Sequence, residues 1–440
     1  MKDLKIIKVL QNHFEKKFFP VGGCVRDFVM GVEPKDIDLC TAVNVNEIVK
    51  NPPAGCTVVP LGLEHGTVAI IFEGTTYEVS TFRKDVSCDG RHAVVEFTDN
   101  IMEDLVRRDF TMNAMAFDTE TGEIIDPFNG KEDLSNRVIR AVGDPFTRFA
   151  EDHLRMIRAC RFSGNFGGMN IHQDTFEAIR VLCANIDSVS KERVREELIK
   201  MMKCEKPSVC IRNLLTSGLL AHIIPQLAAC VGSSQLPHHQ EDVFVHHMMV
   251  LDRIPKTDPL LRLAALVHDV GKPVVKTPEG KFYDHHIVGG DMVQTWMEEL
   301  KFSNEDKEFV VMVVREHMFS VNKKMSDGSI RKLIVRSNGH WKELIEFKRA
   351  DLLGRIPSVI PEEVAELLLR IEKIATTPAA MTVKDLAISG KDLISVFNLK
   401  PGPIFGIMLN RCLAVVLENP SANNRDNLLD IVKENIDEMP

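Results

Sequence analysis

The stretch VGGCVRDFVMGVEPKDIDLC, residues 21–40, decides the fold of this chain. Two glycines, Gly22 and Gly23, stand directly before a helix-like segment that carries Arg26. Glycine lets the backbone approach a phosphate group closely, and the start of a helix offers unpaired N–H groups and a positive dipole end. The guanidinium of Arg26 can bind phosphate in a forked geometry. Such a Gly-Gly turn fits a nucleotide site, but it also fits an ordinary turn.

Two aspartates, Asp36 and Asp38, follow this turn with one residue between them. We expect a strand here, and residues i and i+2 of a strand project from the same face. Paired carboxylates repel each other unless a cation lies between them, and oxygen ligands that leave room for substrate phosphates suit Mg²⁺. Two such ions can activate a hydroxyl nucleophile and neutralise a leaving pyrophosphate. The alternative is a pair of solvated aspartates in a turn after Pro34.

The rest of the chain predicts a mixed α/β head followed by a long helical body. Short β-branched and aromatic runs, TVVPLGL, GTVAIIF and TYEVSTF, predict strands between residues 57 and 82. Glu78 lies in the last of these runs, where it either completes the acidic cluster or lies exposed on an edge strand. From about residue 145 onward, apolar residues recur three and four apart, which is typical of helices. Breaks in this pattern divide the chain into regions 1–140, 141–232, 233–375 and 376–440.

Composition indicates an ordinary globular protein. Of the 440 residues, 44% are hydrophobic and 27% are charged, and the formal net charge is −9. The longest apolar runs are too short to span a membrane, so we expect no membrane partner. The N-terminal segment resembles an amphipathic helix rather than a secretion signal, and the cysteines form no CxxC pair. These features favour a cytoplasmic protein with reduced thiols, in which RNA would have to bind a local basic surface.

Six motifs then occur in order along the chain: GGCVRD, DID, YEVSTFR, RRDFTMNAMAFD, DPFNGKEDL and EDHLRMIRACRF. Together they resemble the class II nucleotidyltransferases, which comprise bacterial and eukaryotic CCA-adding enzymes and bacterial poly(A) polymerases. The resemblance continues to SGKDLISVFNLKPGPIFGIML near the C-terminus. It implies an α+β fold, in which a polymerase-beta-like nucleotidyltransferase head precedes an all-helical body. It also implies tRNA, CTP and ATP as partners and Mg²⁺ as cofactor.

The resemblance assigns roles to residues of the head. In the family the DxD pair binds the catalytic metals, which implies Asp36 and Asp38, with Glu78 as third carboxylate. The residues that would hold the triphosphate and the sugar are Gly22, Gly23, Arg26, Arg107, Arg108, Asp109 and Asn113. Their chemistry agrees, since guanidinium groups suit phosphate whereas carboxylate and amide groups suit ribose hydroxyls.

Side chains of EDHLRMIRACRF select the incoming base in the family. The resemblance implies that Asp152 and Arg155 face the Watson–Crick edge and that Glu151 supports them. At a spacing of i, i+3, one helix would place the pair on the same face. Arg158 and Arg161 continue the stripe and are expected to reach phosphate. Outside these motifs, an i, i+3 surface ion pair would be the simpler interpretation.

The product of the reaction depends on two further features. Residues 84–105 correspond to the flexible loop that lets the family's active site change from CTP to ATP, and both DGRH and VEFT are present. Poly(A) polymerases of the family usually carry a long basic C-terminal tail, whereas this chain ends in NIDEMP. Full CCA addition is therefore favoured, and an A-adding enzyme or a bacterial poly(A) polymerase is the alternative.

A second set of motifs lies between residues 240 and 351. VHHMM, ALVHDVGKP, YDHHIV, REHMF and KRADLLGR resemble an HD-type phosphohydrolase domain. The resemblance implies metal ligands at His246, His268, Asp269 and Asp351, with His285 and His317 as additional candidates. Imidazole with carboxylate suits a divalent transition metal, which can turn bound water into a nucleophile. A phosphatase or a phosphodiesterase for 2′,3′-cyclic RNA ends would follow. A phosphohydrolase with an inactive transferase head is a further alternative.

Overall fold

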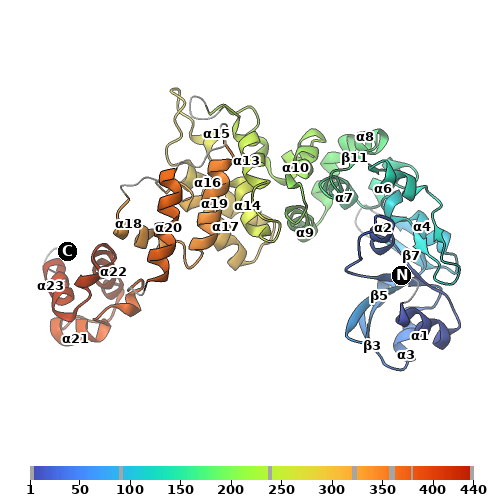
Figure 1. Ribbon diagram of the computed structural model, residues 1–440, viewed down its shortest axis with the longest axis horizontal. Coiled ribbons are helices and arrows are strands. Elements are labelled where there is room, and N and C mark those ends of the chain that lie inside the picture. Colours follow the sequence, from blue (N-terminus) through green and yellow to red (C-terminus); the bar gives the residue numbers. More distant parts are fainter. Residues whose placement is uncertain are drawn as a thin grey trace. The chain divides into compact units, whose positions relative to one another are not determined.

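The computed structural model describes residues 4–88, 93–235, 240–319, 325–355, 362–377 and 380–436. The chain divides into two compact units, Met1–Pro225 and Gln226–Pro440, and each is described by itself (Figure 1). None of the helices in the described ranges is long and apolar enough to cross a lipid bilayer.

A five-stranded mixed sheet forms the centre of the first half of unit 1. Its strand order is β1-β2-β5-β4-β3. Strand β2 pairs in parallel with β5, whereas the other neighbours pair antiparallel. The three predicted strands are confirmed as β3, β4 and β5. The strands of the sheet are β1 (Phe18–Pro20), β2 (Asp38–Thr41), β3 (Cys56–Gly62), β4 (Thr67–Phe72) and β5 (Thr75–Thr81).

The two faces of this sheet are covered differently, and the difference places the acidic residues. One face packs against helices α1 (Lys5–Phe14) and α3 (Val45–Lys50) through a buried apolar cluster that includes Leu39 and Val79. Side chains alternate between faces along a strand. Asp38 and Glu78, which directly precede Leu39 and Val79, therefore belong to the opposite face. That face also carries Cys40, which packs with Leu105 of α4.

Helices and short strand pairs follow the sheet in unit 1. The strand pairs are β6–β7 (Arg83–Cys88, Ala93–Phe97), β8–β9 (Ala116–Phe117, Ile124–Ile125) and β10–β11 (Val138–Ile139, Asn170–Ile171). The helices are α2 (Gly23–Val29), α4 (Ile101–Val106), α5 (Gly130–Ser135), α6 (Pro145–Glu151), α7 (Leu154–Ser163), α8 (Gln173–Leu182), α9 (Lys191–Met202), α10 (Pro207–Thr216) and α11 (Leu219–Ile223). The short helix α12 (Pro225–Ala228) begins at the last residue of unit 1 and continues into unit 2.

The i, i+3 spacing in EDHLRMIRACRF predicted one continuous helix, but the structure has two helices here. Helix α6 ends at Glu151 and α7 begins at Leu154, while Asp152 has an extended backbone with φ −150° and ψ 104°. The Asp152 side chain accepts a hydrogen bond from the backbone N–H of Leu154 at 3.1 Å. Aspartate side chains often compete in this way with the backbone bonds of a helix. The expectation that one helix face presents Asp152 and Arg155 was therefore wrong.

Unit 2 consists mainly of helices and contains no β-strand among its described residues. Helices α14 and α17 each pack against α19 and against each other, and α16 packs along α17. A separate apolar cluster, which includes Leu393, Cys412 and Leu428, holds the C-terminal helices together. The helices are α13 (Val243–Leu251), α14 (Pro259–Val267), α15 (Lys272–Val275), α16 (His285–Glu299), α17 (Asn304–Glu316), α18 (Asp327–Arg336), α19 (Trp341–Leu353), α20 (Glu362–Thr376), α21 (Gly390–Phe397), α22 (Pro403–Glu418) and α23 (Arg425–Ile436).

Candidate functional sites

Two carboxylates lie side by side on the open face of the sheet. The register of the parallel β2–β5 pair sets Asp38 directly beside Glu78, and both line a cleft of about 470 Å³. Partial burial raises the pKa of Glu78, and the charge of Asp38 raises it further. Burial also raises the pKa of Asp38; Arg108 opposes this rise and Asp36 adds to it. Adjacent carboxylates that resist ionisation are the donor set that a divalent cation stabilises.

Asp36 lies in a bend before β2 rather than in the strand. The expectation that a strand presents Asp36 and Asp38 on one face was therefore wrong. Asp36 is also absent from the described residues that line the cleft. Its charge still reaches Asp38, whose pKa it raises. The three predicted acidic residues thus comprise one pair fixed by strand register and a neighbour held by a loop.

The glycine turn brings the backbone against an arginine of the cleft. Gly22 has φ +71°, which L-residues rarely adopt, and a Cβ atom there would lie 2.7 Å from an Arg108 guanidinium nitrogen. Arg26, three residues into α2, donates to the Asn113 side-chain oxygen at 2.8 Å and to Asp27 at 2.7 Å. Gly22, Gly23, Arg26 and Asn113 all line the cleft.

Arg107 and Arg108 are held at the cleft by Asp104, which the sequence motifs did not identify as a site residue. Asp104 of α4 is fully buried and accepts hydrogen bonds from Arg107 at 2.8 Å and from Arg108 at 3.0 Å. Burial alone would raise the pKa of Asp104, but the two guanidinium groups lower it below its usual value. Asp104 therefore stays ionised and fixes both arginines from behind.

Asp109 forms a second ion pair, with Arg158, and both residues line the cleft. Its Oδ2 accepts two hydrogen bonds from Arg158, at 2.6 and 2.8 Å, and its Oδ1 accepts from the Asn113 amide at 3.0 Å. Burial by itself would raise the pKa of Asp109, but Arg158 and Asn113 outweigh this effect and lower it to about 2. In this arrangement Asp109 orients Asn113 and Arg158.

Asp152 and Arg155 both line the cleft, but separate contacts hold them. Arg155 donates to the Glu151 carboxylate at 2.6 Å and to the backbone oxygen of Arg107 at 2.9 Å. Asp152 instead accepts a hydrogen bond from Arg193 of α9 at 2.8 Å. Glu151 thus contacts Arg155, and Asp152 is held from another helix.

Arg161 and Glu197 form a pair behind the cleft. Arg161 is absent from the described residues that line the cleft, and its Nε donates to Glu197 at 2.6 Å. Glu197 is 1% exposed and also accepts from Lys200 at 3.1 Å. The sequence carries a signal for this residue, because Glu197 lies three residues after Val194 and four before Met201 on the apolar stripe of α9.

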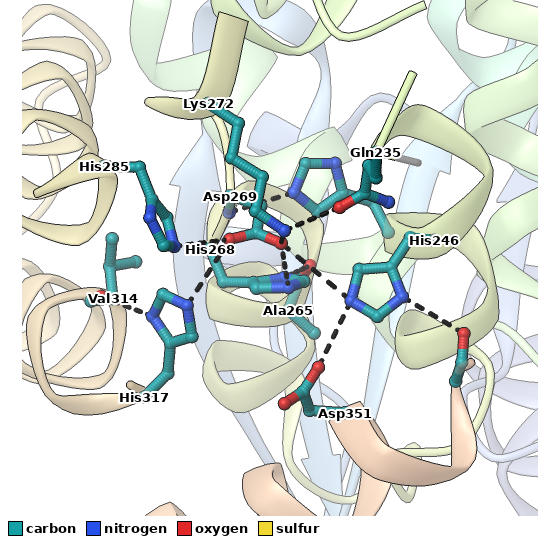
Figure 2. Close-up of polar contacts among 12 residues, drawn as sticks. Gln235, His246, Ala265, His268, Asp269, Lys272, His285, Val314, His317 and Asp351 are labelled. Atoms are coloured by element: carbon teal, nitrogen blue, oxygen red, sulfur yellow. Dashed lines mark hydrogen bonds and ion pairs between the residues drawn. The ribbon is translucent and has the colours of Figure 1, made fainter. Parts of the chain in front are cut away.

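Unit 2 contains a buried cluster of histidines and aspartates that converge from different helices (Figure 2). His246 lies in α13, His268 and Asp269 follow α14, His285 begins α16, His317 follows α17 and Asp351 lies in α19. Two trios have donor atoms within 4.8 Å of one another: His246, His268 and Asp351, and then Asp269, His285 and His317. The structure therefore brings together all six residues that the HD motifs singled out.

Asp269 lies at the centre of this cluster (Figure 2). One carboxylate oxygen is 3.1 Å from Nε2 of His285 and 3.4 Å from Nε2 of His317, and the other is 3.2 Å from Nε2 of His268. Lys272 contacts the second oxygen at 2.6 Å. Burial opposes ionisation of Asp269, but the ammonium group of Lys272 holds its pKa well below its usual range.

The four imidazoles are oriented as metal ligands. In each ring Nδ1 lies 2.7 to 3.1 Å from a backbone carbonyl oxygen, so that Nδ1 donates and Nε2 carries the free lone pair. Burial lowers the pKa of His317 to about 4, which keeps this ring neutral at pH 7. Neutral imidazoles with carboxylates fit a divalent transition metal. His246, Asp269, His285, His317 and Asp351 also line a cavity of about 470 Å³.

Models of three protein families match the chain. Residues 18–140 match the poly A polymerase head domain. Residues 168–231 match a family described as "Probable RNA and SrmB-binding site of polymerase A". Residues 286–432 match a family described as tRNA nucleotidyltransferase domain 2.

Curated proteins extend the match to nearly the whole chain. The CCA-adding enzyme of Anoxybacillus flavithermus is 30% identical over 438 residues, which covers 97% of this chain and 94% of that protein. The chain belongs to the CCA-adding enzyme family. Another member, the multifunctional CCA protein of Xanthomonas euvesicatoria, is 31% identical over 85% of this chain and 93% of its own length. The match to the CCA-adding enzyme of Geobacillus is 40% identical but covers 54% of that protein.

Solved structures of CCA-adding enzymes share the fold. The Bacillus stearothermophilus CCA-adding enzyme in complex with CTP superimposes with a TM-score of 0.71 at 25% identity, covering 99% of this chain and 98% of that one. The Thermotoga maritima CCA-adding enzyme complexed with tRNA aligns with a TM-score of 0.57 at 18% identity. The expected mixed-sheet head and helical body of a class II nucleotidyltransferase are confirmed.

One predicted element of the family falls on residues that the structure does not describe. DGRH, residues 89–92 of the expected loop, lies outside the described residues. The flanking segments form strands β6 and β7, which pair antiparallel. Arg83, the first residue of β6, lines the cleft.

Proposed function

We propose that this protein is a tRNA nucleotidyltransferase that adds C, C and A to the 3′ end of tRNA from CTP and ATP, without a nucleic-acid template. One observation carries the proposal: Asp38 and Glu78 lie side by side at the edge of a cleft that arginines line, in a chain that belongs to the CCA-adding family. Such a cleft suits a metal–triphosphate complex. A tRNA substrate would place the protein in the cytoplasm.

Asp36, Asp38 and Glu78 would hold Mg²⁺ in this proposal. The bound ions would help to deprotonate the attacking 3′-hydroxyl and neutralise the departing pyrophosphate. The new bond joins the 3′-oxygen to the α-phosphorus, and the bond from the α-phosphorus to the bridging oxygen breaks. Four arginines that line the cleft would bind the triphosphate: Arg26, Arg107, Arg108 and Arg158. A bound cation would be favoured here because partial burial raises the pKa of both carboxyl groups, and because the charge of Asp38 raises that of Glu78 further.

The protein itself would select the base. The Asp152 carboxylate can accept a hydrogen bond from the exocyclic amine of cytosine or adenine, and Arg155 can donate to the neighbouring ring nitrogen. Uracil and guanine present a carbonyl where the amine is needed, which would leave Asp152 unpaired and adjacent to an acceptor. Arg161 contacts Glu197 behind the cleft, so in this scheme it supports α7 rather than binds phosphate.

Transcribed tRNA that lacks its last three nucleotides provides the test. CTP alone should add two nucleotides, and CTP with ATP should add three. Extension by ATP alone would favour an A-adding enzyme or a bacterial poly(A) polymerase. Asp38→Ala should abolish addition of both nucleotides, whereas Glu120→Ala removes an exposed carboxylate that forms a surface ion pair with Lys17 and should leave both reactions intact.

A second activity is favoured by the cluster of unit 2. We infer that His246, His268, Asp269 and Asp351, together with His285 and His317, hold one or two divalent transition metals. Water activated at this site would attack the phosphorus of a phosphate ester, and the alcohol would leave with a proton. Lys272, Lys281 and Arg355 line the same cavity and suit an anionic substrate. One relative is named a multifunctional CCA protein.

Metal content and activity test this second site separately from the first. His268→Ala with Asp269→Ala should remove the bound transition metal, measured by elemental analysis, together with hydrolysis of 2′,3′-cyclic nucleotides. CCA addition should persist. If the purified wild-type protein binds no transition metal when Mn²⁺, Co²⁺ or Ni²⁺ is supplied, the cluster is not a metal site and these helices have a structural role only. We also propose the division into residues 1–140 as the nucleotidyltransferase head, 141–232 as the nucleotide-selection and RNA-binding region, 233–375 as the HD-type domain and 376–440 as the C-terminal region that binds tRNA.

A further inference from the structure

The Asp152 carboxylate is held at both of its oxygens. Oδ1 accepts a hydrogen bond from the Leu154 backbone N–H at 3.1 Å, and Oδ2 accepts one from the Arg193 guanidinium at 2.8 Å. Leu154 begins α7, whereas Arg193 lies in the first turn of α9. Two donors from two helices therefore fix the plane of this carboxylate. Each oxygen keeps a lone pair for a further donor.

Arg193 is suited to position a neighbour rather than to stabilise the fold. Its pair with Asp152 is partly exposed, at 36% and 25% of the two side chains, and such pairs add little to stability. Arg193 also lines the transferase cleft alongside Asp152 and Arg155. A guanidinium presents donors in a fixed plane, so the group that it binds takes a defined orientation.

We propose that Arg193 is a positioning residue for base selection, which holds Asp152 so that its free lone pair faces the exocyclic amine of the incoming base. This inference rests on the proposed function. Without Arg193, the carboxylate retains one donor, the Leu154 amide, and rotates about its last side-chain bond. The acceptor then no longer has a fixed direction, and discrimination between an amine and a carbonyl is lost.

The inference distinguishes two kinds of role for a cleft arginine. If Arg193 bound the triphosphate or an RNA phosphate directly, its loss would lower kcat/KM for every nucleotide by the same factor, because all four nucleotides share the triphosphate. If it acts through Asp152, its loss would change the ratio between CTP and UTP, which differ at the position of the amine. Substitution of Asp152 should then change the same ratio between CTP and UTP.

Arg193→Gln is the test variant and Arg180→Gln is the matched control. Arg180 lies in α8, where it forms an exposed ion pair with Glu177, so the control also removes one arginine from one carboxylate. The measurement is kcat/KM for CTP and for UTP in the first addition to tRNA that lacks its 3′ end. We expect the CTP-to-UTP ratio to fall at least tenfold in Arg193→Gln and to recover in part in Arg193→Lys. Arg180→Gln should keep the wild-type ratio.

Asp152→Ala completes the test. It should lower the CTP-to-UTP ratio as Arg193→Gln does, and the double variant should be no worse than Asp152→Ala alone. An equal loss for CTP and UTP in Arg193→Gln, or a further fall of the ratio in the double variant, would overturn the positioning role while leaving the proposed function intact. An unchanged ratio in Asp152→Ala would instead overturn base selection by Asp152, and the role of Arg193 with it. Thermal unfolding of each variant should match that of the wild type.

Discussion

Replacing Asp109 with asparagine tests how the ion pair between Asp109 and Arg158 at the cleft contributes to stability and to transfer. Asp109 is 8% exposed and bonds Arg158 through one oxygen, while its other oxygen accepts from Asn113. Asparagine keeps the size of the side chain and one oxygen. Its amide would face the Arg158 guanidinium, so that two donors would oppose each other where an ion pair had been.

The magnitude follows from the pKa of Asp109. A fall from the ordinary value of 3.8 to about 2 corresponds to about 2 kcal/mol of stability at pH 7. The sign is fixed by the lowered pKa in the folded state: this stability is fully present above the unfolded pKa and is lost as the pH falls toward 2. We therefore expect Asp109→Asn to lower the free energy of unfolding by about 2 kcal/mol between pH 5 and 8.

Urea unfolding of both proteins, followed by circular dichroism from pH 3 to pH 8, provides the measurement. The difference between them should stay level above pH 5 and shrink below pH 4, because Asp109 of the unfolded wild-type chain then takes up a proton while folded Asp109 stays ionised down to about pH 2. Transfer should also weaken, since Arg158 and Asn113 line the cleft. A difference under about 0.5 kcal/mol at pH 7 would contradict this expectation, because contributions that small are typical of ion pairs exposed to solvent.

Further substitutions probe other parts of the two units. Gly22→Ala forces an alanine into a backbone conformation with a positive φ and displaces the Arg108 guanidinium. We therefore expect the free energy of unfolding to fall by about 1–2 kcal/mol and the KM for CTP and ATP to rise. Glu197→Gln removes a buried charge that accepts hydrogen bonds from Arg161 and Lys200. Thermal unfolding should show that the free energy of unfolding falls by about 2 kcal/mol at pH 7. Because the pKa of Glu197 is lowered in the folded state, this cost should diminish in acid. Gly271→Ala places a Cβ atom 2.1 Å from the backbone oxygen of His285, which cannot move aside as a side chain can. We expect this substitution to lower the free energy of unfolding by about 3 kcal/mol and to remove the bound transition metal. A variant with the metal content of the wild type would contradict the close approach of Gly271 to His285.

Local pattern was sufficient to predict much of the head. Alternating apolar residues predicted strands β3, β4 and β5, and the glycine turn followed by a helix was found at Gly22 and α2. The amphipathic N-terminal segment forms α1 and buries Ile6, Ile7 and Leu10. These elements follow from the spacing of residues along the chain, so a single sequence contains the information needed to predict them.

Features that depend on long-range contacts were not predictable in the same way. The break between α6 and α7 depends on a side-chain hydrogen bond at Asp152 that competes with the helix. Strand register, rather than the DxD spacing, places Asp38 beside Glu78, and the loop before β2 leaves Asp36 apart. The histidine cluster comes from several helices, and the sequence indicated it by motif resemblance alone.

We propose that protein side chains choose C, then C, then A. The most direct test of this proposal is to sequence the products formed on tRNA that lacks its 3′ end when all four nucleoside triphosphates are present at equal concentration. We expect that nearly every extended molecule ends in CCA and that extension then stops. Tails of A alone, or products that contain U or G as often as C, would contradict it.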